Sequence, residues 1–270
     1  MNQQTPGSYV LTAYVTLMAV LVILPIAVVL GASLSESAYL TFPPQGLTLK
    51  WYRETIENSL WTDSFWLSLQ IGCMVAAFAT LIGVPAAMAL RNMRGPLATG
   101  LQTLFLSPLM LPTILIGLSL LQFYQKAGIG TSALAVTLGH TIIACPYVIR
   151  LVLASFAGVD PNLERAASIL GAGPIRKFMR VTFPLIRHGI LAGALFSFIV
   201  SLDDVNIALF LSDVHTTPLP VQLFSYIEQN ADPLGAAVAS ILVLLASAVI
   251  LICDRIVGIE WLFGIKQRTA

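Results

Sequence analysis

The sequence predicts an all-α, polytopic membrane protein that crosses the bilayer with six helices. Hydrophobic residues make up 57% of the 270 residues and charged residues only 10%, whereas ordinary soluble domains carry about 25% charged residues. Uncharged apolar runs recur along the chain. A run of about 20 residues crosses the hydrocarbon core as a helix that satisfies its own backbone hydrogen bonds.

The six spans are expected in one transmembrane domain that covers residues 1–270. Five of them are built on uncharged runs, and the span at 185–211 also contains Asp203 and Asp204. The first run is longer than the core of a signal peptide and is followed by no persuasive cleavage site, so we expect it to be retained as a helix. The spans are placed at 9–32, 64–90, 100–124, 131–153, 185–211 and 234–255.

The loop at 33–63 contains the sequence TFPPQGLTLKWYRETIENSLW, in which Pro and Gly mark a turn. Trp51, Tyr52, Trp61 and Trp66 suit a belt at the membrane interface. A short surface helix and an ordinary connecting loop both fit this segment. In the third span, Pro108 and Pro112 predict a kink, which either shapes a transport path or is inert.

The basic residues predict the orientation, because cytoplasmic flanks of membrane helices are enriched in Lys and Arg. With the N-terminus inside, 11 of the 14 basic residues fall on the cytoplasmic side and only Lys50, Arg53 and Lys126 fall outside. Both termini are therefore expected in the cytoplasm. The cytoplasmic set is Arg91, Arg94, Arg150, Arg165, Arg176, Lys177, Arg180, Arg187, Arg255, Lys266 and Arg268.

The cytoplasmic loop at 158–184 is expected to hold two short helices. Asp160 followed by Pro161 is a good helix start and Gly171 a good stop, which predicts a helix at 161–170. A second helix at 174–182 should end before Pro184. On the first helix an apolar stripe runs along one face, which suits either a groove on another protein or packing against the chain's own membrane domain. The stripe consists of Leu163, Ala166, Ala167 and Leu170.

This loop resembles the coupling motif of ABC importer permeases, in which Glu-Ala-Ala, three residues, Gly, nine residues, Ile or Val, one residue and Leu-Pro follow one another. The chain supplies Ala166, Ala167, Gly171, Val181 and Pro184 at this spacing, with Phe183 in place of Leu. At the motif's Glu position it has Arg165, preceded by Leu163 and Glu164, and polyamine-type permeases often have Leu-Glu-Glu-Ala-Ala there. The resemblance assigns coupling to Leu163, Glu164, Arg165, Ala166, Ala167, Gly171 and Pro184, and leaves open whether Glu164 or Arg165 contacts the ATPase.

The resemblance implies a transport subunit of the bacterial inner membrane rather than an enzyme, with no catalytic, cofactor or metal site of its own. Its expected partners are an ATP-binding cassette ATPase dimer that holds ATP and Mg, a second, non-identical permease subunit, an external solute-binding protein and the lipid bilayer. The sequence GAGPIRKF is no phosphate loop, because Arg176 and Phe178 replace the required Gly and Ser or Thr. The basic residues follow membrane topology and indicate no nucleic-acid partner.

Two acids in the fifth span need an explanation, because a charge at the centre of a membrane helix costs about 2.5–3.5 kcal/mol. Ser197, Ser201 and Asp204 share a helix face, which either lines a narrow path or forms a close helix contact. We favour Asp204 as the residue that faces the path, with Asp203 near Asn206 and bonded to a neighbouring helix. Alternatively, both acids cap a helix break or pair with basic residues of a partner. All five residues are candidates for the substrate path. His140 is expected to be a hydrogen-bonded interior residue.

The segment SLDDVNIALFLSDVHTTPLP also resembles spermidine and putrescine permeases, whose fifth helix has Ser-Phe/Leu-Asp-Asp/Glu followed by Thr-Thr-x-Leu-Pro. The resemblance implies a cationic amine cargo such as a polyamine. An opine, an amino-acid-like solute or another amine remains an alternative, as does a non-transporting scaffold. An intramembrane aspartyl hydrolase is disfavoured, because it needs two acids from different helices.

Overall fold

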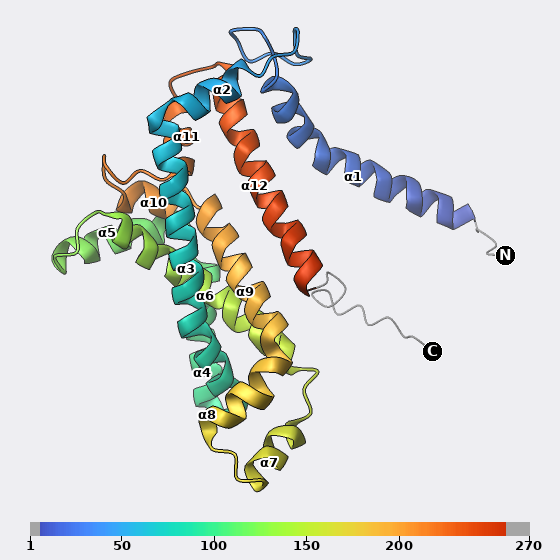
Figure 1. Cartoon of the computed structure of the whole chain (residues 1–270), viewed down its shortest axis with the longest axis vertical. Coiled ribbons are helices and arrows are strands. Elements are labelled where there is room, and N and C mark those ends of the chain that lie inside the picture. The colour runs from blue at the N-terminus through green and yellow to red at the C-terminus, as the bar shows by residue number, and fades with distance from the viewer. Residues whose placement is uncertain (1–5, 258–270) are drawn as a thin grey trace. The chain divides into compact units, whose positions relative to one another are not determined.

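The chain forms a helical membrane protein, shown in Figure 1 as a computed structural model that describes residues 6–257. Its helices are α1 Pro6–Ala32, α2 Lys50–Glu57, α3 Ser59–Asn92, α4 Pro96–Leu106, the 3-10 turn η1 Ser107–Met110, α5 Thr113–Lys126, α6 Ala133–Phe156, α7 Pro161–Ile169, α8 Pro174–Lys177, the π turn η2 Phe178–Thr182, α9 Phe183–Asp203, α10 Asn206–Leu211, α11 Leu219–Ile227 and α12 Pro233–Val257. Lys266 and Arg268, which were counted for the orientation, lie outside the described residues.

The all-α membrane fold predicted from the sequence is confirmed. Within the described part of the chain, five helices are long and apolar enough to cross a bilayer, and a bent pair of helices makes a sixth span if the pair is counted as one. The five are Tyr9–Ala32, Ser59–Asn92, Ala133–Phe156, Pro174–Asp203 and Pro233–Arg255. The chain divides into two compact units. One contains the described residues up to Thr62 with Leu223–Leu245, and the other contains Asp63–Gln222 with the described residues from Ala246.

In the first unit, the short helix expected as one of two possibilities at 33–63 is present as α2. The Trp51 ring is buried beneath it, and its indole N–H donates to the Ser35 carbonyl at 2.9 Å. Trp61 is also buried and meets the Tyr226 ring edge to face, with 5.3 Å between centroids. The expected interfacial belt is therefore wrong for Trp51 and Trp61, because both rings fill this unit's own core, whereas Trp66 is exposed.

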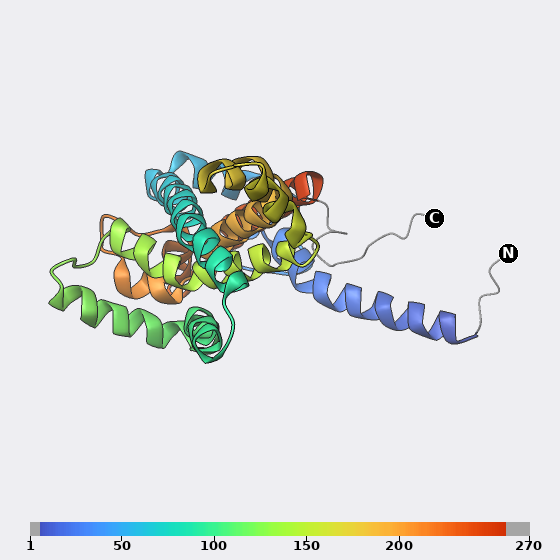
Figure 2. The ribbon, with the colours of Figure 1, turned by 90° about the horizontal axis from the view of Figure 1, so that it is seen from below.

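The core of the second unit is built around α6, which contributes many of its buried side chains. α9 lies along α6, as Figures 1 and 2 show. Gly189 makes this close approach possible, because a Cβ there would lie 2.6 Å from Ser155 Oγ and 2.8 Å from the Leu151 carbonyl oxygen. Small residues on membrane helices permit such backbone contact. Figure 1 places α7 and α8 at one end of α6 and α9, away from α5 and α10.

Two spans differ from their expected course because their helices break. The kink expected at Pro108 and Pro112 is a bend of 104° between Pro96–Met110 and Thr113–Lys126, and Figure 2 shows the two arms running in different directions. The span expected at 185–211 ends at Asp203 and is followed by the separate helix α10. Asp204 has an extended backbone, with φ −77° and ψ 111°, and interrupts the helix between the two.

The second helix of the cytoplasmic loop does not end before Pro184, as the sequence led us to expect. Helical structure continues from Pro174 to Asp203. The π turn Phe178–Thr182 lies directly before Phe183 and Pro184, which begin α9. Proline lacks an N–H and clashes with the carbonyl four residues earlier in a regular α-helix. The wider π turn removes that constraint, so the helix passes through the proline.

Candidate functional site

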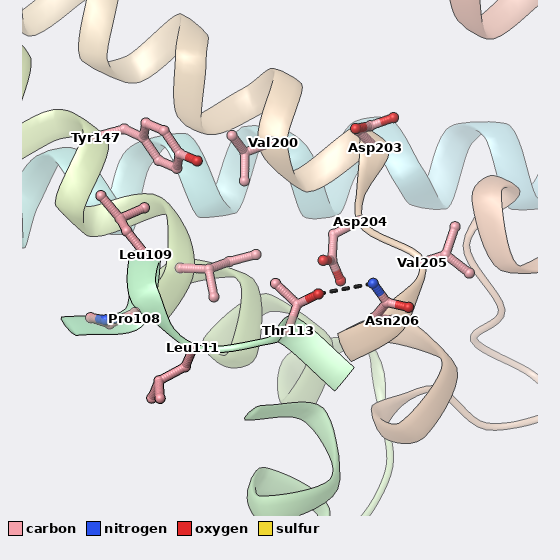
Figure 3. Close-up of a pocket in the computed structure, with 11 residues that line it drawn as sticks. Pro108, Leu109, Leu111, Thr113, Tyr147, Val200, Asp203, Asp204, Val205 and Asn206 are labelled. Carbon is pink, nitrogen blue, oxygen red and sulfur yellow. Dashed lines mark hydrogen bonds between the residues drawn. The ribbon is translucent and has the colours of Figure 1, made fainter. Parts of the chain in front are cut away.

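The two helix breaks lie next to each other in the second unit and are joined by side chains. The Asn206 amide donates to Thr113 Oγ1 at 2.8 Å, which links the start of α10 to the start of α5 (Figure 3). Asp204 Oδ1 accepts from the Ile207 backbone N–H at 2.8 Å and thereby caps α10. A side-chain bond thus joins the two breaks, and one backbone N–H at the second break is satisfied by a side chain.

A cavity of about 440 Å³ opens between the breaks. Its polar lining comprises Thr113, Tyr147, Asp203, Asp204 and Asn206, and the remaining lining is apolar and comes from η1, α6 and α9 and the segments next to them. Within the part of the chain that the structure describes, no Lys or Arg lines this cavity. Among the described residues, the formal charges that line it are therefore the two carboxylates, which favour a cation over an anion.

The two aspartates have different surroundings (Figure 3). The Asp204 side chain is 9% exposed, and its Oδ1 lies 3.6 Å from Nε2 of the buried His140. Asp203 is exposed, and among the described residues it has no hydrogen-bond or ion-pair partner. The expected bond from Asp203 to a neighbouring helix is thus not formed among the described residues. Both acids line the cavity. Asp204 also bonds at a helix break, which is one of the alternatives for these acids, because the chain leaves the helix at Asp204 and turns that carboxylate towards α10.

The serines on the expected path face pack against α6 instead of lining the cavity. Ser197 Oγ donates to the Gly193 carbonyl at 2.9 Å and lies 3.5 Å from the Ala144 carbonyl oxygen. Ser201 Oγ lies 2.9 Å from His140 Nδ1. Of the two alternatives for this stripe, the structure has the close helix contact. The prediction that His140 is a hydrogen-bonded interior residue is confirmed.

At the other end of the second unit, the loop at 158–184 presents an apolar surface. α7 starts as expected, with the Asp160 carboxylate accepting from the Asn162 N–H at 2.9 Å, and it stops before Gly171, whose φ of +80° favours glycine. Ile169 and Leu170 are 85% and 87% exposed. Leu163 and Ala166 are exposed as well and Ala167 is half-buried, so the side of α7 that carries the stripe is available to a partner.

The two charged residues of the motif, Glu164 and Arg165, have different contacts. Glu164 Oε1 lies 3.1 Å from Nη1 of Arg91 and accepts from Thr182 Oγ1 at 2.8 Å, so Glu164 is bonded within the chain. Arg165 is exposed, and its Nη1 lies 3.4 Å from Asn162 Oδ1. Pro184 lies in the first turn of α9.

Several residues at these two places were not identified from the sequence. Tyr147 and Thr113 line the cavity, but an aromatic or a threonine in an apolar span carries no distinctive signal. From the sequence, Arg91 indicates only the orientation of the chain in the membrane. Its position at the end of a span, 73 residues before Glu164, gave no indication of the pairing.

Comparisons with known proteins agree with this fold. Residues 79–259 match the family of binding-protein-dependent transport system inner membrane components, and the chain belongs to that family. It is therefore a multi-pass inner-membrane permease subunit of an ABC transporter, and ATP hydrolysis takes place on a separate partner rather than in this chain.

Similar proteins include amine transport permeases. The chain is 27% identical over 233 residues to the spermidine/putrescine transport system permease protein PotC of Haemophilus influenzae, covering 86% of this chain and 90% of the relative. It is 32% identical over 206 residues to the putrescine transport system permease protein PotI of Escherichia coli, with 73% of each covered. A putative 2-aminoethylphosphonate transport system permease protein, PhnV of Salmonella choleraesuis, is 28% identical over 242 residues, covering 88% of this chain and 89% of the relative.

Solved structures share the fold. A bacterial ABC transporter that imports the acidic polysaccharide alginate matches with a TM-score of 0.68 at 16% identity, covering 100% of this chain and 99% of that one. The MetNI methionine ABC transporter matches with a TM-score of 0.60 at 20% identity, covering 71% of this chain and 92% of that one. At these identities the likeness establishes the architecture only.

Proposed function

We propose that this permease subunit forms part of the path for a small cationic amine such as a polyamine, and that the cavity between the helix breaks lies on that path. The observation that carries the proposal is the cavity lining, which holds two carboxylates and, among the described residues, no basic side chain. A carboxylate offsets part of the dehydration cost that the membrane interior imposes on a cation.

The five residues expected along the path then have two roles. Asp203, Asp204 and Asn206 line the cavity. Ser197 and Ser201 hold α9 against α6 behind it. The position of the two helix breaks next to the cavity supports this path. Non-helical backbone at membrane depth is tolerated where it lines a cavity or is buried in protein.

The named relatives support an amine as the cargo. Spermidine, putrescine and 2-aminoethylphosphonate each carry an amine. The last relative makes an aminoalkylphosphonate the second candidate, although its anionic group would be repelled by the two carboxylates.

The coupling partner is proposed to be a dimer of ATP-binding cassette ATPases that holds ATP and Mg. The exposed face of α7 would enter a groove on one ATPase, with Leu163 and Leu170 as apolar contacts and Ala166 and Ala167 allowing close approach. Gly171 would then turn the chain away from the groove. A second, non-identical permease and an external solute-binding protein complete the proposed assembly. Both termini are placed in the cytoplasm, following the distribution of Lys and Arg.

The test is uptake by the complete complex reconstituted in proteoliposomes with ATP on the ATPase side. Labelled putrescine should be taken up when the binding protein is present, and 2-aminoethylphosphonate should be taken up far more slowly. Asp203→Asn should lower putrescine uptake, whereas Asp63→Asn, which changes an exposed aspartate outside the cavity, should not. Equal putrescine uptake rates for Asp203→Asn and wild type would refute the proposed cation path. If ATP hydrolysis by the complex does not respond to the binding protein, the alternative function of a non-transporting scaffold subunit would be favoured instead.

A further inference from the structure

A polar cluster fastens the coupling helix α7 to its own chain. A single oxygen, Oε1 of Glu164, receives the Arg91 guanidinium at 3.1 Å and the Thr182 hydroxyl at 2.8 Å. Arg91 lies in the last turn of α3, and Thr182 ends the π turn that leads into α9. We call Arg91, Glu164 and Thr182 the α7 clamp, since it joins three elements at one atom.

The clamp is partly shielded from water. The side chains of Arg91 and Glu164 are only 16% and 20% exposed. The Arg91 guanidinium also lies 4.2 Å from the centre of the Phe156 ring at the end of α6, and this contact fixes the side chain by a cation–π interaction. A charge-assisted bond in such surroundings is stronger than an exposed ion pair, which contributes about 0–1 kcal/mol.

Little else attaches α7 to the bundle. None of its side chains, all of which lie in the described part of the chain, is buried. A cavity of about 200 Å³ lies between it and the bundle, lined by residues that include Arg91, Phe156, Glu164 and Phe178. A further side-chain contact, Lys177 Nζ to Ser168 Oγ at 3.3 Å, joins α7 only to the neighbouring α8 and is exposed. The clamp is therefore the main side-chain connection from α7 to α3 and α9.

We propose that Arg91 is a positioning residue for coupling, which acts through Glu164 so that α7 moves together with the ends of α3 and α9. This inference rests on the proposed docking of α7 on an ATPase. A rigid-body displacement of α7 is then transmitted to two membrane helices directly, instead of only through the non-helical connections at 157–160 and 170–173. Without the clamp, ATP hydrolysis continues with less transport for each ATP.

A second consequence follows for the partner. Because Glu164 is bonded within the chain, we infer that the polar contact to the ATPase is made by Arg165, which is exposed on the same helix. A guanidinium pairs best with carboxylates. The groove on this ATPase therefore presents an acidic residue to α7.

The test of the clamp is a charge reversal in the reconstituted complex, with labelled putrescine taken up per ATP hydrolysed as the readout. Arg91→Glu and Glu164→Arg should each lower this ratio about tenfold, which corresponds to about 1.4 kcal/mol of coupling. The double variant should recover to within about twofold of wild type, because the pair is restored in reverse. Arg94→Glu is the matched control, since it makes the same charge change on an exposed side chain three residues along and should leave the ratio unchanged. Single variants that behave like the control, or a double variant no better than the singles, would overturn the clamp.

Amide hydrogen exchange on the intact complex gives a readout that does not depend on transport. Arg91→Gln should speed exchange in α7 about tenfold and leave α6 unchanged, and unaltered exchange in α7 would contradict the clamp even if the reversed variants fail to assemble. A wild-type complex whose ATPase ignores the binding protein would count against the proposed function, while the exchange result would still decide the clamp.

The partner contact is tested by retention of the ATPase on the purified permease. Arg165→Glu should release the ATPase, and Glu164→Gln, which keeps the oxygen acceptor, should retain it. The opposite pattern would assign the contact to Glu164 and refute the inference for Arg165.

Discussion

Asp203 and Asp204 are neighbours in sequence, and their different contacts predict that substitutions at the two positions will have separable effects. Asp204 Oδ1 accepts the N–H of Ile207, a fully buried residue. Asp204→Ala removes this cap, which costs about 0.5–2 kcal/mol, and leaves a buried donor unpaired, which costs about 1–3 kcal/mol. The two estimates describe the same loss, so we expect a destabilisation of about 1–2 kcal/mol.

Asp204→Asn keeps an oxygen acceptor, and Asn caps helices about as well as Asp, so its stability should stay close to wild type. Asp203→Asn changes an exposed side chain, and such substitutions usually alter stability by less than about 0.5 kcal/mol. Both Asn variants remove a negative charge from the cavity lining. Uptake should fall about five- to tenfold, as expected if the passing cation loses about 1–1.4 kcal/mol of stabilisation.

The measurements are the melting temperature of the purified complex and putrescine uptake normalised to assembled complex. Asp204→Ala should lower both, with a melting shift of about 2–4 °C for each kcal/mol in a chain of this size, whereas Asp204→Asn and Asp203→Asn should lower uptake alone. A larger melting shift for Asp203→Asn than for Asp204→Ala would refute the assignment of the cap. Wild-type uptake in both Asn variants would leave the acids with a structural role only.

Three further predictions concern packing, docking and orientation. Gly189→Ala should lower the melting temperature, because its Cβ would meet a backbone carbonyl at 2.8 Å and overpacking costs about 1–3 kcal/mol. In the control Gly173→Ala, the new Cβ meets nothing within 4 Å, so the melting temperature should not change. Ala166→Trp should abolish stimulated ATPase activity and leave membrane insertion intact, and normal stimulation would contradict docking through this face. With the native cysteines replaced, Arg176→Cys should be labelled only from the cytoplasm and Val214→Cys only from outside, and the reverse labelling would overturn the orientation.

The features that the sequence predicted correctly depend on residues that lie near one another in the sequence. The spans follow from local hydropathy, and α7 follows from Asp160, Pro161 and Gly171, which act within one or two turns. The same local rules misplaced the helix end at Pro184, because a π turn accommodates a proline that would terminate a regular α-helix.

What the sequence by itself determined is the membrane class, the approximate spans, the surface chemistry of α7 and the family, since apolar length, caps and motif spacing are properties of contiguous residues. Only the tertiary structure decided that Asp203 is the exposed acid and that Glu164 is bonded to Arg91, 73 residues away. The first outcome depends on how α9 and α10 pack on α6, and the second depends on how α7 packs against α3. A side chain's partner is set by that packing. At Asp203 and Asp204 the helix break turns the second carboxylate inward and leaves the first exposed.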